Sequence, residues 1–307
     1  MSPEFNFSEA FERNIGWLTE AEQQKLRTSC VAVAGLGGAG GYQLQALARL
    51  GVSRFKIADP DSFELINFNH QIGATIQTIG KKKADVTRDM LLSINPESKI
   101  DLYPEEVSAA NVDDFLTGAD VAIDGIDFFE QNAKLLFFKK CREKKIPAIT
   151  ACPLGFGASV IVFSTDGMKY EDYFDITDEM DEKIKRLYVT FGLSPSPLCL
   201  SYMDRKALEL EGRRAASVSP GLLQVGAMAA TEVVKILTNK GTVLYCPHIY
   251  QVDFLTQQAR KKYFPMGMRS LFQRMKRWLL LKLMNHQLYY LLRPGKKKFK
   301  IEFKLFD

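Results

Sequence analysis

The chain has 307 residues, of which 46% are hydrophobic and 25% charged, and its formal net charge is +5. This composition excludes disorder over most of the length and allows one large domain or two modest ones. Five cysteines without a CxxC pair disfavour a disulfide framework and a zinc site. No signal-peptide pattern and no run near the roughly 20 apolar residues of a membrane span is present, so we expect a cytoplasmic protein.

Apolar runs typical of β-strands alternate with helical spacing over the first 150 residues. The predicted elements, in chain order, are strand 30–34, helix 42–50, strand 54–58, helix 84–94, strand 120–124, helix 129–143 and strand 146–150. Alternation of this kind predicts a Rossmann-like α/β fold, in which helices cover both faces of a mostly parallel sheet.

The pattern changes after residue 150. The later predicted elements are a strand over 158–163, an irregular loop-rich segment over 165–215, a helix over 221–237 and two short strands over 243–254 that turn at Pro247. We expect this smaller mixed β/α part to complete the first half, so that residues 1–265 form one domain.

A basic tail follows, which we place at residues 266–307. Residues 260–307 hold 14 Lys and Arg against 2 Asp and Glu, whereas the rest of the chain has a net charge of −7. A Lys-rich stretch covers 295–300, and an alternating stretch follows over 300–305. Five apolar residues share one face of a predicted helix: Leu271, Phe272, Met275, Trp278 and Leu279.

Such a helix fits an anionic membrane surface, which would make the protein peripheral at the membrane, or an acidic partner. It fits equally a docked helix on its own domain, with its charges in solvent. We expect no nucleic-acid partner, because no aromatic platform or known module accompanies the charge.

A glycine-rich loop joins the first predicted strand to the first predicted helix. Its glycines are Gly35, Gly37, Gly38 and Gly40. Backbone amides at such a helix N-terminus can hold phosphate, and Asp59 at the end of the second strand could accept hydrogen bonds from a ribose. These features predict a nucleotide site, and a dinucleotide-binding oxidoreductase would share all of them.

A polar cluster beyond Asp59 separates the two kinds of nucleotide enzyme. It contains Asp61, Asn67, Asn69, His70, Gln71, Lys83 and Asp127. Hydride transfer has no need for it, whereas attack on the α-phosphate of ATP does. That reaction needs cations for the phosphoryl charge, for which Lys83 and His70 are candidates, and a carboxylate for Mg²⁺, such as Asp127. Asn67 and Asn69 could orient the triphosphate.

These motifs, in this order, resemble the ThiF/MoeB family of adenylyltransferases, which share their adenylation domain with ubiquitin-activating enzymes. The similarity runs from about Arg13 to about Leu237 and includes the Ala-Thr-Glu-Val-Val-Lys-Ile-Leu stretch of the late helix. The resemblance implies that the C-terminal carboxylate of a small ubiquitin-like protein or peptide attacks ATP. The products would be an acyl adenylate and pyrophosphate.

The resemblance also implies roles for individual residues. By this likeness Gly38 contacts phosphate, Asp59 holds the ribose, Asn67 and Asn69 line the triphosphate, Lys83 stabilises charge at the α-phosphate, and Asp127 binds Mg²⁺. Gln71 keeps the residue type that the family has at its position. A homodimer is implied, in which Arg13 of one subunit reaches the ATP of the other.

Several positions depart from the family pattern. His70 replaces an arginine, and histidine is only partly protonated near neutral pH. Phe128 and Asn132 replace a usual Asn and a common Arg. The 212–220 stretch lacks the nucleophilic cysteine of many relatives, so Cys199 is either a displaced nucleophile or a small apolar filler. A NAD-binding oxidoreductase and a non-catalytic nucleotide-binding scaffold of the same fold therefore remain the alternatives.

Overall fold

The computed structural model describes residues 4–203 and 216–279. The predictions for 295–305, and those for the first part of the 212–220 stretch, lie outside the described residues. The chain divides into two compact units, residues 1–268 and residues 269–307. In the second unit, residues 271–279 are helical.

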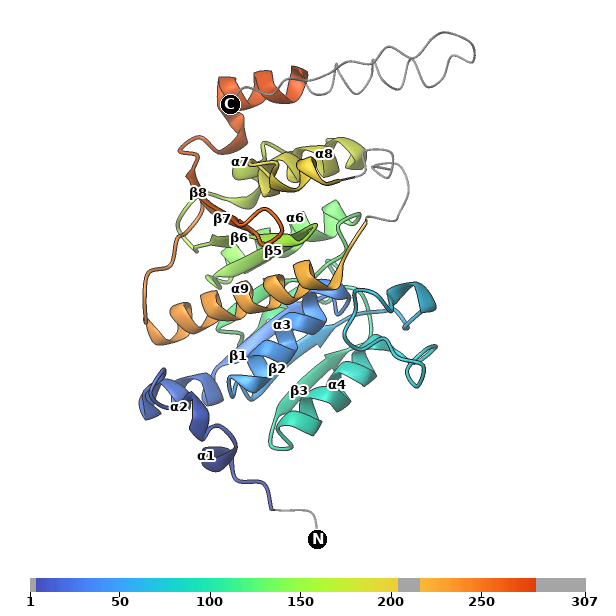
Figure 1. The fold of residues 1–307 in the computed structure, drawn as a ribbon, viewed down its shortest axis with the longest axis vertical. Helices are drawn as coiled ribbons and strands as arrows, with labels where there is room; N and C mark the ends of the chain where they lie inside the picture. The colour runs from blue at the N-terminus through green and yellow to red at the C-terminus, as the bar shows by residue number, and fades with distance from the viewer. Residues whose placement is uncertain (1–3, 204–215, 280–307) are drawn as a thin grey trace. The chain divides into compact units, whose positions relative to one another are not determined.

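The first unit is built on one eight-stranded sheet with the order β3-β2-β1-β4-β5-β6-β7-β8 (Figure 1). The strands are β1 (Cys30–Ala34), β2 (Arg54–Ala58), β3 (Lys99–Tyr103), β4 (Val121–Asp124), β5 (Ala148–Leu154), β6 (Gly157–Phe163), β7 (His248–Asp253) and β8 (Gln258–Tyr263). Strands β1 to β5 pair in parallel, and β5 to β8 pair as antiparallel neighbours. The Rossmann-like, mostly parallel sheet with a smaller mixed part is confirmed.

Helices cover both faces of this sheet. On one face lie α3 (Gly38–Arg49), α4 (Lys83–Ile94) and α9 (Ser219–Thr238), and on the other lie α5 (Val112–Leu116), α6 (Gln131–Glu143), α7 (Tyr170–Phe174) and α8 (Glu182–Leu193). The chain enters through α1 (Phe7–Ala10), the 3-10 turn η1 (Glu12–Asn14) and α2 (Glu20–Thr28). Two hydrophobic cores result, one on each face, because the central strands are buried on both sides.

Helix α9 is the only described helix that is long and apolar enough to cross a membrane by length and composition. Half of its most apolar stretch is buried in the first unit, and it packs against α3, β5 and β6 (Figure 1). Within this fold, α9 is therefore a core helix.

Two predictions for the later part are wrong. The segment 165–215 is not loop-rich throughout, because it contains α7, α8 and the 3-10 turn Leu198–Ser201. The buried positions of α8 begin with Lys185, which masks the helical pattern. The hairpin turns not at Pro247 but between β7 and β8, where Asp253 Oδ1 accepts the Thr256 amide at 2.8 Å. Before Pro247 only an isolated bridge forms, between Tyr245 and Val162.

Candidate active site

The candidate site lies at the carboxyl ends of β1, β2 and β4. From β1 the chain crosses to β2 on one side, and after β3 it returns to β4 on the other side. A sheet of this kind leaves a crevice at the point where the order reverses, and ligands bind there. The β1–α3 and β4–α6 loops touch at this point, because a Cβ on Gly35 would collide with the Gly125 carbonyl.

The glycine loop leaves the N-terminus of α3 open. Gly37 is the N-cap and no side chain caps the helix, so its first amides keep their hydrogen-bonding capacity for an anion. A Cβ on Gly38 would lie 2.8 Å from Leu222 Cδ1 and 3.1 Å from the His70 carbonyl oxygen. Glycine is therefore the residue that lets α9 and the His70 loop approach the phosphate-binding turn closely.

Asp59 braces the glycine loop. Its Oδ2 accepts the Leu36 amide at 2.6 Å and its Oδ1 accepts the Asp61 amide at 2.9 Å. Burial raises the pKa of Asp59, while the positive charge of Lys83 and the two amide hydrogen bonds oppose that shift. Each carboxylate oxygen keeps a second lone pair, so the ribose role stays a prediction that this geometry allows.

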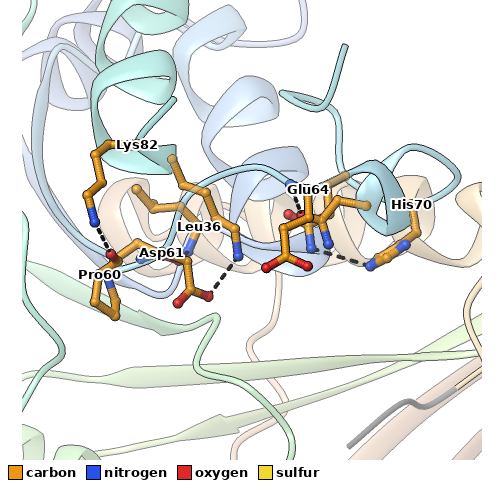
Figure 2. Close-up of polar contacts among 10 residues, drawn as sticks. Leu36, Pro60, Asp61, Glu64, His70 and Lys82 are labelled. Atoms are coloured by element: carbon orange, nitrogen blue, oxygen red, sulfur yellow. Dashed lines mark hydrogen bonds and ion pairs between the residues drawn. The ribbon is translucent and has the colours of Figure 1, made fainter. Parts of the chain in front are cut away.

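Lys83 is the buried cation of the site. It begins α4, and its Nζ lies 2.9 Å from Asp61 Oδ2. The Lys83 side chain is 8% exposed and that of Asp61 is 64% exposed, so Asp61 reaches the lysine from the solvent side. The neighbouring Lys82 points elsewhere and donates to the Pro60 carbonyl at 2.7 Å (Figure 2).

The His70 loop holds its polar side chains in a local network. His70 Nδ1 lies 2.7 Å from Asn69 Oδ1, and Asn69 Nδ2 donates to the Ser217 carbonyl at 2.8 Å. Burial, followed by the charge of Lys83, lowers the pKa of His70. Both causes disfavour the protonated form of His70, so its expected role as a cation stays a prediction.

Gln71 and Asn67 differ in how their amide groups are used. Gln71 is buried, its Oε1 has no partner, and its amide lies 3.7 Å from the point where a Cβ on Gly37 would stand. Asn67 Oδ1 accepts the Glu64 amide at 2.9 Å. The Gln71 oxygen is thus a buried acceptor beside the glycine loop, and a nucleotide donor would satisfy it.

The β4–α6 loop presents two carboxylates to solvent, those of Asp127 and Glu130. Asp127 is exposed, and its Oδ1 accepts the Phe129 amide at 3.0 Å. Asp124 is buried and pairs with Lys134 Nζ at 2.7 Å, so it is not open to a ligand. No group of three or more metal-binding side chains gathers among the described residues. A single carboxylate suits Mg²⁺ that is shared with nucleotide phosphates, so Asp127 fits that ion.

Arg13 lies at the opposite end of α3. Asn14 Nδ2 donates to Gln23 Oε1 at 3.0 Å, and Gln23 Nε2 donates to the carbonyl of Leu50, the C-cap of α3, at 2.9 Å. Helix α3 has 12 residues and is therefore about 18 Å long. The exposed Arg13 consequently lies a helix length away from the glycine loop of its own chain.

Cys199 is not set up as a nucleophile. It is 8% exposed within the 3-10 turn Leu198–Ser201, and burial raises the pKa of its thiol. Catalytic cysteines need the thiolate form and access to the substrate. Both properties favour the filler interpretation.

A glycine loop, an acidic strand end and an exposed carboxylate at the switch point of a mostly parallel sheet define a nucleotide-binding α/β domain. Comparison with known proteins identifies the family to which this domain belongs. The chain belongs to the ThiF family, whose model matches residues 11–270. This confirms the resemblance found in the motifs.

Individual relatives carry different names. The chain is 35% identical over 127 residues to the tRNA threonylcarbamoyladenosine dehydratase of Haemophilus influenzae, covering 41% of this chain and 48% of that protein. It is 27% identical over 217 residues to the sulfur carrier protein ThiS adenylyltransferase of Escherichia coli, covering 71% and 75%. The chain spans about half the length of the dehydratases it matches.

Solved structures share the fold. The E. coli MccB structure with ATP has a TM-score of 0.60 at 21% identity, covering 80% of this chain and 66% of that chain. The PaaA structure has a TM-score of 0.63 at 20% identity, covering 86% and 77%. Identities at this level show the fold alone.

Proposed function

We propose that the chain is an ATP-dependent adenylyltransferase that activates the C-terminal carboxylate of a small ubiquitin-like protein or peptide. The observation that carries the proposal is the convergence of an uncapped glycine loop, a buried lysine and an exposed aspartate at the sheet's switch point. Relatives named as adenylyltransferases of a sulfur carrier protein and of molybdopterin synthase support it.

The position of each residue in the site suggests its role in the proposed reaction. The α3 amides bind phosphate oxygens, and Lys83 exchanges the exposed Asp61 for a phosphate of ATP. Mg²⁺, held by Asp127, would supply charge neutralisation to the departing pyrophosphate. The substrate carboxylate oxygen attacks the α-phosphorus, the bond from that phosphorus to the bridging oxygen breaks, and pyrophosphate leaves with the bond electrons. Fixed donors and cations lower the barrier because negative charge grows on the phosphoryl oxygens.

ATP with Mg²⁺ is expected to stabilise the protein against unfolding more than NAD does, because Lys83 and Asp127 suit a triphosphate and its metal. Ligand at about 100 times its dissociation constant adds about 2.7 kcal/mol to the free energy of unfolding. Thermal unfolding with each nucleotide, with and without Mg²⁺, measures the difference. A larger stabilisation by NAD would instead identify a dinucleotide-binding oxidoreductase.

A homodimer would bring Arg13 to the partner's nucleotide, because Arg13 cannot reach the glycine loop of its own chain. Mixing inactive Arg13→Ala and Lys83→Ala proteins is expected to restore about a quarter of wild-type pyrophosphate exchange, since half of the dimers regain one of their two sites. The matched control mixes Lys83→Ala with Asp127→Asn, which leaves every site defective. No recovery despite measured subunit exchange would contradict action in trans.

The second unit supports a separate proposal, attachment to an anionic membrane surface. Four basic residues and no acid lie over 269–279, and three of the four belong to the helix 271–279. Five of its apolar side chains are more than half exposed: Leu271, Phe272, Met275, Trp278 and Leu279. An apolar face with adjacent cations suits the interface of anionic lipids.

Fluorescence of Trp278 tests this attachment in a Trp17→Phe background, which leaves one tryptophan. We expect a blue shift with vesicles containing phosphatidylserine and a weaker shift at high salt, because screening acts beyond the Debye length. Leu271→Glu should reduce it. A helix docked on its own domain would show no shift with any vesicle.

A further inference from the structure

Helix α8 is attached to the start of α6 by its first turns. Glu182 Oε1 accepts the Asn132 amide at 3.2 Å. Lys185, which is 1% exposed, donates through Nζ to Asn132 Oδ1 at 2.7 Å and to the Asp178 carbonyl at 2.8 Å. These contacts hold the residue after Lys185 at a defined place beside the β4–α6 loop.

That residue, Arg186, stacks on the loop that carries Asp127. Its Cζ lies 5.3 Å from the centroid of the Phe129 ring, and the Phe129 amide is the donor to Asp127 Oδ1. Stacking of this kind occupies the face of the guanidinium and leaves its in-plane N–H donors for other groups.

Arg186 has no acid partner among the residues that the structure describes. Its Nε is buried without a hydrogen-bond partner, and none of the described carboxylates lies within ion-pair distance. Two arginines of the first unit do have acid partners: Arg27 pairs with Glu97 at 2.7 Å, and Arg88 pairs with Asp85 at 2.9 Å. A guanidinium held in place with unused donors is suited to an oxyanion that arrives with a ligand.

The charges of the candidate site also favour an additional cation that binds an oxyanion of the ligand. Lys83 is a buried cation of the site. The carboxylates along its described loops include Asp59, Asp61, Asp127 and Glu130. ATP brings further negative charge. We propose that Arg186 binds a phosphate oxygen of ATP at the β4–α6 loop and supplies the cation on the side of the site opposite Lys83. This inference rests on the proposed function.

Direct nucleotide binding by the full chain tests the inference without a known acyl substrate. Arg186→Gln is expected to weaken ATP·Mg²⁺ binding tenfold or more in calorimetry, since a hydrogen bond to a charged group is lost. Adenosine binding should stay within twofold. Arg186→Lys should bind ATP·Mg²⁺ more weakly than the wild type and more tightly than Arg186→Gln. Lysine keeps the positive charge but lacks the paired, coplanar N–H donors of the guanidinium. Arg142→Gln, whose parent side chain donates to the Gly167 carbonyl near the other end of α6, is the matched control.

Each possible result of these binding measurements supports or contradicts the proposed role of Arg186. Equal losses for ATP and adenosine would overturn the inference and show that Arg186 only shapes the loop. Unchanged ATP affinity in Arg186→Gln would overturn it while the proposed function stands. Failure of the wild-type chain to bind ATP would instead overturn the proposed function and the inference with it.

Discussion

Lys83→Ala is expected to slow pyrophosphate exchange about 100-fold or more, measured with the acyl substrate present. The Lys83 Nζ is buried next to the loops that hold the phosphates, where a fixed cation stabilises developing charge better than water does. The folded state should survive, because the ion pair of Lys83 is with an exposed partner, Asp61.

Lys82→Ala is the matched control for this effect. Lys82 is the adjacent lysine, it is exposed, and its Nζ contacts the Pro60 carbonyl instead of the site. We expect its exchange rate to stay within threefold of wild type. Equal losses in the two variants, or near-normal exchange in Lys83→Ala, would contradict the role of Lys83.

Asp127→Asn is expected to reduce exchange by a similar factor and to raise the Mg²⁺ concentration needed for half-maximal rate. The amide keeps the acceptor for the Phe129 N–H but loses the negative charge that attracts the metal. The Mg²⁺ dependence separates this role from a structural one, because a distorted loop would lower the rate at every Mg²⁺ concentration.

Glu130→Gln serves as the control in the same loop, since Glu130 is an exposed acid three residues later. Its Mg²⁺ dependence should match that of the wild type. An unchanged Mg²⁺ requirement in Asp127→Asn would remove Asp127 from the proposed metal site.

The central strands could be predicted from the sequence because burial dictates their composition. Every residue of β1 is buried, so its run is continuously apolar and its predicted bounds are those of the structure. Strand β3, at the sheet edge, alternates Lys99, Ile100 and Asp101 with partial exposure, and no prediction covers it. The turn between β7 and β8 contains neither Gly nor Pro, and Gln257 takes the positive φ there instead.

The place of the candidate site could also be predicted, because the glycine loop and the strand ends are local in sequence. The hydrogen-bonding and stacking partners of the site residues could not be predicted. Asn69 bonds to the carbonyl of Ser217, and Arg186 stacks on Phe129 from a helix that the sequence pattern does not reveal. Contacts between distant segments depend on tertiary packing, and one sequence carries no local signal for them.

Binding of an acyl-adenylate mimic tests the central claim most directly, because it needs no knowledge of the natural substrate. The affinity of the full chain for 5′-O-(glycylsulfamoyl)adenosine would be compared with its affinities for AMP and NAD. A site built for an acyl adenylate should bind the mimic about 100-fold more tightly than AMP, and Lys83→Ala should reduce that advantage. Binding of the mimic no tighter than AMP, together with tighter binding of NAD, would contradict adenylation.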